Sequence, residues 1–278
     1  MQYYRDGLVR QSRLSRRTFV AGGLAGAFAM NFRAGHAASP EGPSSFLARI
    51  AAVPDGRTLR TGDGADIILP HILPPGPDRH EPMEDLTPVR LAARALADLA
   101  LGREVRVDLA VPGQDRHGRW RGSVAIDGRD VATETVLLGM TRVFPEPGAT
   151  PAEVAPLLAA ERAARDGRAG FWGAGFWRSG FGGDGYFAVH DAAAYGGGTD
   201  RFEIVAGAAR RQSRIGDRLH LEFGDDWRDD FTAGLSRRAQ RAVEVEDFEG
   251  RALTLRGWVR HWNGPFMEIE EAVQIEGL

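Results

Sequence analysis

Short runs of alternating apolar and polar residues, separated by turn residues, open the part of the chain that follows residue 45. Residues 46–53 alternate well enough for a strand, and an Asp-Gly turn leads to a second strand at 57–61. A Gly-Asp-Gly turn then leads to an apolar strand at 65–69. This pattern predicts a three-strand meander.

Helical spacing and further alternation predict the next elements. Prolines in residues 70–88 cannot donate to a sheet, so we expect an irregular loop there. Thr87 is the expected N-cap of an amphipathic helix that stops at Gly102. Strands are predicted at 104–111, 120–126 and 141–144, and helices at 131–138 and 151–166.

Together these elements predict a mainly β fold with helices, in which residues 46–173 form a small closed β-barrel of the OB type. A glycine- and aromatic-rich stretch at 167–185 interrupts the pattern. It is typical of a strap across the barrel or of a base-stacking surface, and we favour the strap because stacking surfaces usually lie on rigid strands. Residues 174–200 are interpreted as a linker.

The last part of the chain, residues 201–278, is again rich in strands. The predicted strands are 202–209, 218–223, 230–235, 252–262 and 265–275, with a short basic helix at 236–243. Asn263-Gly264 is a specific hairpin signal between the last two strands. We predict a second small β-barrel of OB-like form, or an open five-stranded sheet.

The N-terminal residues have the pattern of an export signal. A twin-arginine pair, Arg16-Arg17, precedes an apolar run too short for a comfortable membrane span, and the small-residue site ends at Ala37. We predict a Tat-type signal peptide at 1–37 and a linker at 38–45, hence a periplasmic or secreted protein that does not span the membrane after cleavage. The alternative is an uncleaved N-terminal anchor.

Charge and cysteine content narrow the chemistry. Cleavage after Ala37 would remove six arginines and one aspartate, which leaves 29 basic and 37 acidic residues and a net charge of −8. Such an acidic protein is not a typical scavenger of bulk nucleic acid. The chain has no cysteine, which excludes disulfides and thiolate chemistry.

Between residues 46 and 172 the chain resembles the staphylococcal nuclease (thermonuclease) family. Val53–Thr58 stands where the family has V-x-D-G-D-T, and residues 67–75 stand where it has R-L-x-x-I-D-x-P-E. Asp115–Arg119 matches D-x-Y-G-R, and Glu161–Trp172 matches E-x-x-A-x-x-x-x-x-G-x-W. The resemblance implies the family's OB-type barrel, and residues 201–278 resemble the small barrel behind some exported nuclease modules.

In that family aspartates hold a Ca²⁺ ion, a glutamate helps to activate water, and two arginines stabilise the developing charge. By the same resemblance, Arg119 is the one catalytic position retained. The others are replaced by Arg57, Ile68, Leu73 and Gly76, none of which can ligate Ca²⁺. We therefore expect a degenerate nuclease, without a cofactor, retained to bind nucleic acid or another polyanion or to act as a scaffold.

Two alternatives remain open for this barrel. A rebuilt site for Ca²⁺ or another divalent metal would use the histidines and acids of the proline-rich loop, in which case the protein is an active phosphodiesterase. For Arg119, the alternative to a catalytic position is a purely structural role, because an arginine often opens a strand after a turn. The loop candidates are His71, Asp78, His80, Glu81, Glu84 and Asp85.

Two charged groups in residues 201–278 are further candidates. Four aspartates surround Trp227, a pattern typical of a hydrated loop rather than of an EF-hand Ca²⁺ site. A basic face is either solvated surface or a polyanion groove, and a third class of function is binding to an envelope protein. The basic residues are Arg210, Arg211, Arg214, Arg237, Arg238 and Arg241.

Overall fold

The computed structural model describes residues 45–76, 86–110, 114–173, 186–195, 198, 200–226, 228–243, 245 and 247–278. The predicted signal peptide and most of the linker after it lie outside these ranges. Glu41–Leu278 form one compact unit. None of the helices in the described ranges has the length and apolar character needed to cross a bilayer.

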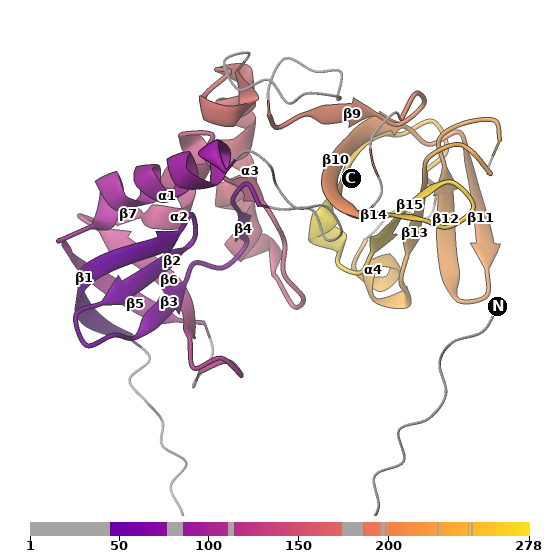
Figure 1. Cartoon of the computed structure of the whole chain (residues 1–278). Coiled ribbons are helices and arrows are strands. Elements are labelled where there is room, and N and C mark those ends of the chain that lie inside the picture. Colours follow the sequence, from indigo (N-terminus) through magenta and orange to yellow (C-terminus); the bar gives the residue numbers. More distant parts are fainter. Residues whose placement is uncertain are drawn as a thin grey trace, which may run out of the picture. The chain divides into compact units, whose positions relative to one another are not determined.

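A closed β-barrel occupies the first part of this unit (Figure 1). Its strands run in the order β3-β2-β1-β5-β6, and the parallel pairing of Ile67 with Trp120 joins β3 to β6 and closes the ring. This confirms a mainly β fold with a barrel compatible with the OB type. The strands are β1 Ser45–Asp55, β2 Thr58–Thr61, β3 Asp66–Ile68, β5 Glu104–Leu109 and β6 Trp120–Ile126, with β7 Arg129–Asp130 paired to β6.

Helices α1 Thr87–Ala100, α2 Val131–Leu137 and α3 Pro151–Asp166 belong to the same part of the chain. Inward-facing strand residues such as Leu59 and Val107 pack with Leu96 of α1 and Val154 of α3 in one buried cluster. A capping box between Thr150 and Glu153 fixes the start of α3. The sequence therefore places its apolar faces around a single barrel core.

Two local predictions for this region were wrong. The N-cap of α1 is Leu86, with no side-chain cap, so Thr87 is the first helical residue. The loop expected to be irregular contains β4 Ile72–Leu73, which pairs antiparallel with β8 Arg142–Val143. Proline does not prevent this pairing, because neither β4 residue is a proline.

A second sheet of eight strands follows, in the order β11-β12-β13-β15-β14-β10-β9, with β16 paired to β14. Its own buried cluster includes Leu221, Phe231 and Leu255. The elements are β9 Val189–Asp191, β10 Arg201–Ala208, β11 Arg211–Ile215, β12 Arg218–Glu222, β13 Thr232–Leu235, α4 Arg237–Ala242, β14 Ala252–His261, β15 Pro265–Ile269 and β16 Ile275–Glu276.

The hairpin predicted at Asn263-Gly264 is confirmed, since both residues have positive φ and β14 pairs with β15. The single strand expected at 265–275 is wrong, because a 3-10 turn at Ala272–Gln274 separates β15 from β16. The sequence pattern also missed β9 and β11. Strand β11 is polar and exposed, so apolar alternation does not mark it.

A third apolar cluster links the barrel part to the second sheet. Phe171 and Trp172, in the 3-10 turn Gly170–Trp172, are buried there with Phe187 and Phe202. Buried rings cannot stack on bases, so the base-stacking interpretation is excluded for these two residues. Residues 174–185 of the same stretch lie outside the described ranges.

A buried ion pair also joins the two parts. The Arg256 guanidinium of β14 donates to the Glu161 carboxylate of α3 at 2.8 Å, and both side chains are fully buried. The other Glu161 oxygen accepts the N–H of Val143 at 2.7 Å. Arg256 also pairs with Glu276.

Candidate functional site

The turn between β1 and β2 is held by Asp55. Its Oδ1 accepts the N–H of Arg57 at 2.8 Å, and its Oδ2 accepts the hydroxyl of Thr58 at 2.9 Å. Gly56 allows close packing, since a Cβ there would lie 2.6 Å from Cβ of Pro74 and 2.9 Å from Cβ of Ala92. The Asp55 carboxylate therefore serves to fold the turn.

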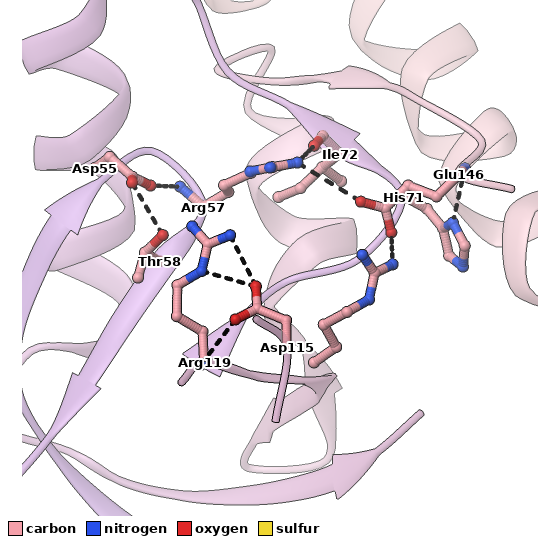
Figure 2. Close-up of polar contacts among 9 residues, drawn as sticks. Asp55, Arg57, Thr58, His71, Ile72, Asp115, Arg119 and Glu146 are labelled. Atoms are coloured by element: carbon pink, nitrogen blue, oxygen red, sulfur yellow. Dashed lines mark hydrogen bonds and ion pairs between the residues drawn. The ribbon is translucent and has the colours of Figure 1, made fainter. Parts of the chain in front are cut away.

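Arg57 leaves this turn and points toward the strand pair β4–β8 (Figure 2). Its Nη1 lies 3.4 Å from the carbonyl oxygen of Ile72, to which it donates, and 3.7 Å from Oε1 of Glu146. Burial lowers the pKa of Arg57, Asp55 opposes that shift, and the charge of Arg119 adds to it. An arginine remains charged at neutral pH nonetheless.

Arg119 stands beside Arg57 and is held by the turn that precedes β6 (Figure 2). Its Nε and Nη2 donate to Oδ2 of Asp115 at 2.9 and 2.8 Å. Oδ1 of Asp115 accepts the backbone N–H groups of His117 and Arg119. These bonds, above all those from the Arg119 side chain, hold the pKa of Asp115 well below its usual range, so this carboxylate stays ionised.

Arg121, two residues further along β6, completes what we call the arginine cluster: Arg57, Arg119 and Arg121. It pairs with Oε2 of Glu146, whose other oxygen faces Arg57. Burial and the charges of Arg57 and Arg119 lower the pKa of Arg121, while Asp115 opposes the shift. The three guanidiniums are close enough to repel one another.

Each side chain of the arginine cluster is partly exposed to solvent. The exposed fraction is 28% for Arg57 and 35% for both Arg119 and Arg121. Glu146, by contrast, is 7% exposed. The arginine side chains of the cluster are therefore partly exposed, whereas the carboxylate shared by Arg57 and Arg121 is buried.

His71 lies next to this cluster and has positive φ. Its Nδ1 accepts the N–H of Glu146 at 3.3 Å. Burial lowers the pKa of His71, Glu153 opposes the shift and Arg121 adds to it, which favours a neutral ring. A neutral imidazole that accepts at Nδ1 carries its proton on Nε2, so the free edge is a donor, which suits an anion better than a metal ion.

The other positions aligned with the nuclease motif carry no charge. Ile68 is buried on β3, opposite Thr58 on one side and Arg121 on the other. Leu73 is half-buried on β4 and packs against the cluster that contains Phe171. Gly76 is exposed, and a methyl group on its Cα would meet no atom within 4 Å.

No group of three histidine or acidic side chains placed to hold a metal ion occurs among the described residues. The predicted rebuilt site lies mostly outside them: Asp78, His80, Glu81, Glu84 and Asp85 fall in residues 77–85. Within the described part, Asp55, Asp115 and Glu146 are each already bonded to an arginine backbone or side chain. The N–H donors of the arginines beside these carboxylates suit a bound anion better than Ca²⁺.

The sequence motif found Arg119 but missed Arg121 and Glu146. Arg121 lies on β6, two residues after Arg119, which stands in the turn just before the strand. This two-residue spacing of arginines can be read from the sequence. Glu146 could not be found from the sequence, because it reaches the cluster only through the β4–β8 pairing.

Most of the six basic residues predicted in the second part have carboxylate partners. Arg210 pairs with Asp225, Arg211 with Glu222 and Arg238 with Glu271. The remaining three, Arg214, Arg237 and Arg241, line one cavity.

The acidic loop before β13 folds on itself. Oδ2 of Asp230 accepts the N–H of Asp226 at 2.7 Å, and Oδ1 of Asp226 accepts the N–H of Arg228 at 3.0 Å. These bonds hold the backbone of the loop. Trp227 itself lies outside the described residues.

In comparison with known proteins, the chain matches no protein-family model and no curated protein. The resemblance to staphylococcal nuclease therefore rests on the sequence segments Val53–Thr58, 67–75, Asp115–Arg119 and Glu161–Trp172.

Proposed function

We propose that this protein is a degenerate member of the staphylococcal nuclease family, with an OB-type barrel that binds nucleic acid or a similar polyanion without cleaving it. The arginine cluster is the binding site. We also propose that the protein acts outside the cytoplasm after export through its twin-arginine leader.

The observation that carries the proposal is the position of Arg57. Its guanidinium lies between a backbone carbonyl and Glu146, in the turn where the nuclease motif has a metal-ligating aspartate. A fixed positive charge there repels a divalent cation and attracts a phosphate oxygen. Arginine suits this task because its planar donors match a phosphate group in pairs.

Hydrolysis would need more than binding. The family's mechanism requires a metal ion and a carboxylate that activates water, and removing one strong electrostatic group typically costs 10²- to 10³-fold in rate, about 3–4 kcal/mol. The replaced positions include both carboxylates of the motif segment, now Leu73 and Gly76. Binding is the part of the chemistry that the remaining side chains support.

The test is binding of a fluorescent single-stranded oligonucleotide, followed by anisotropy in EDTA, with cleavage assayed in parallel with Ca²⁺, Mn²⁺ or Zn²⁺. We expect binding in EDTA and no cleavage. Arg57→Gln and Arg119→Gln should each weaken binding about tenfold, the effect of one charge-assisted hydrogen bond, and each should reduce the salt dependence.

Arg106→Gln is the matched control, because Arg106 is an exposed barrel arginine on β5 paired with Asp108. It should bind like the unaltered protein. Metal-dependent cleavage that Arg119→Gln abolishes would overturn the non-catalytic assignment. Equal binding by all three variants would overturn the assignment of the site.

A further inference from the structure

A cavity of about 570 Å³ lies on the second sheet, away from the arginine cluster. Arg214 of β11 and Arg237 and Arg241 of α4 line it together with Gln240. Its apolar lining consists of Leu219, Val243, Val245 and Phe248. We call this cavity the α4 groove.

The floor of the α4 groove is built from the core of the second sheet. Phe248 is fully buried and Leu219 nearly so, and both belong to the sheet's own apolar cluster. Val243 and Val245 are half-buried and pack against that cluster. The floor is therefore rigid and apolar, and its two valines retain exposed surface that a ligand can cover.

Gln240 fixes the rim. Its Nε2 donates to the carbonyls of Asp217 and Leu235, both at 2.9 Å, which leaves Oε1 to accept from Nη1 of Arg214 at 2.8 Å. Ser236 caps α4 by accepting the N–H of Ala239. The arginines of the rim thus extend from anchored backbone.

The described residues that line the groove include three arginines and no carboxylate. Arg237 is paired with Asp217 at 3.3 Å. Arg214 is bonded to the neutral amide of Gln240, and Nε of Arg241 donates to the backbone carbonyl of Arg237 at 3.2 Å. Among the described residues no carboxylate pairs with Arg214 or Arg241, so these two guanidiniums have donors left for an anion.

We propose that the α4 groove binds an amphipathic monoanion, such as a medium-chain aliphatic carboxylate. The hydrocarbon part lies on Val243 and Val245, and the carboxylate bridges Arg214 and Arg241. The volume is in the range of small-molecule sites, and an apolar floor with a few placed polar groups is their usual composition. A polyanion would not use the apolar floor, which sets this site apart from the arginine cluster.

The test is displacement of the fluorescent anion 1-anilinonaphthalene-8-sulfonate by decanoate, with decyltrimethylammonium and inorganic phosphate as comparison ligands. Decanoate should displace the probe. Phosphate lacks the tail and the ammonium has the wrong charge, so each should be at least about tenfold weaker.

The double variant Arg214→Gln/Arg241→Gln should weaken decanoate binding at least about tenfold, with an unchanged melting temperature. Arg210→Gln is the matched control, because Arg210 is exposed and pairs with Asp225 outside the groove. Val245→Ser should weaken decanoate more than phosphate. Equal displacement by the ammonium, or unchanged affinity in the double variant, would overturn the proposal.

The outcome of the decanoate test is independent of the function proposed for the barrel. Arg57→Gln should leave decanoate binding unchanged, and an oligonucleotide should not compete with decanoate. Competition between the two ligands would show that they share one site and would contradict a separate α4 groove.

Discussion

Two of the places where arginine meets glutamate in this protein differ in burial, with different consequences. At Arg256 and Glu161 both side chains are fully buried, and the second Glu161 oxygen accepts the N–H of Val143. At Arg57 and Arg121 the shared Glu146 is buried but the guanidiniums remain partly exposed. The fully buried pair is a structural link, whereas the partly exposed one belongs to the site that we propose for an anion.

Exposure decides between the two roles. A buried pair loses the hydration of both charges, so each partner depends on the other and neither is free to bind a ligand. A partly exposed guanidinium keeps its hydration and its unused donors. The contrast predicts that changes at the buried pair affect stability, whereas changes at the arginine cluster affect binding.

The largest effect is expected from Arg256→Met, which leaves the Glu161 carboxylate buried without its cation. The free energy of unfolding should fall by about 3–5 kcal/mol, measured by urea denaturation. Arg103→Met removes an exposed pair with Asp127 and should cost less than about 1 kcal/mol. If Arg256→Met costs no more than this control, the buried pair is not a structural link.

The double variant Arg256→Met/Glu161→Leu refines this test. It removes both charges, so most of the loss seen in Arg256→Met should be recovered, although the N–H of Val143 then loses its acceptor. A double variant as unstable as the single one would mean that packing around these residues matters more than their charge.

The next largest loss of stability is expected from Gly56→Ala, in the turn that presents Arg57. The new methyl would overlap Pro74 and Ala92, so we expect a loss of about 1–3 kcal/mol in urea denaturation. Oligonucleotide binding should also weaken, because the turn must shift. Gly76→Ala is the matched control, since its methyl meets nothing within 4 Å and should be neutral or slightly stabilising. Equal stability of the two variants would contradict the close packing at Gly56.

A smaller effect is expected in the pH dependence of folding stability, and it comes from Glu276, which pairs with Arg256. Burial raises the pKa of Glu276, but Arg256, Arg162 and Arg165 outweigh it and the net shift is downward. The ionised form therefore favours the folded state, with a contribution present above about pH 4.5 and lost as the pH falls through the lowered pKa.

Urea midpoints measured from neutral pH down to about pH 3 should fall more steeply for the unaltered protein than for Glu276→Gln, which has no such carboxylate. At neutral pH the variant should be the less stable of the two. Parallel curves for the two proteins would contradict a stabilising role of this ionised group.

The smallest stability effect is expected at the arginine cluster. Arg57→Met should change the free energy of unfolding by less than about 1 kcal/mol, because the side chain is partly exposed and Glu146 keeps Arg121. Oligonucleotide affinity should fall nevertheless. A large loss of stability with unchanged affinity would show that Arg57 is a structural residue like Arg256.

Much of the secondary structure was accessible from the sequence. The bounds of α3 and β6 agree with those predicted, because Thr150 and Pro151 mark the start of the helix and apolar alternation marks the strand. Strands that form only by pairing with another strand could not be predicted from their own residues. Strand β4 has two residues and forms only because β8 lies beside it, and the polar strand β11 forms on the edge of β12.

By itself the sequence determined most of the local elements and the types of side chain in the motif segment, because propensity, turns and side-chain type are properties of neighbouring residues. Only the tertiary structure decided which charged groups lie next to one another. Glu146 and Arg57 are far apart in the chain, as are Glu161 and Arg256. Burial and distance set the strength of a charge, and both are fixed only when the strands pair and the cores close.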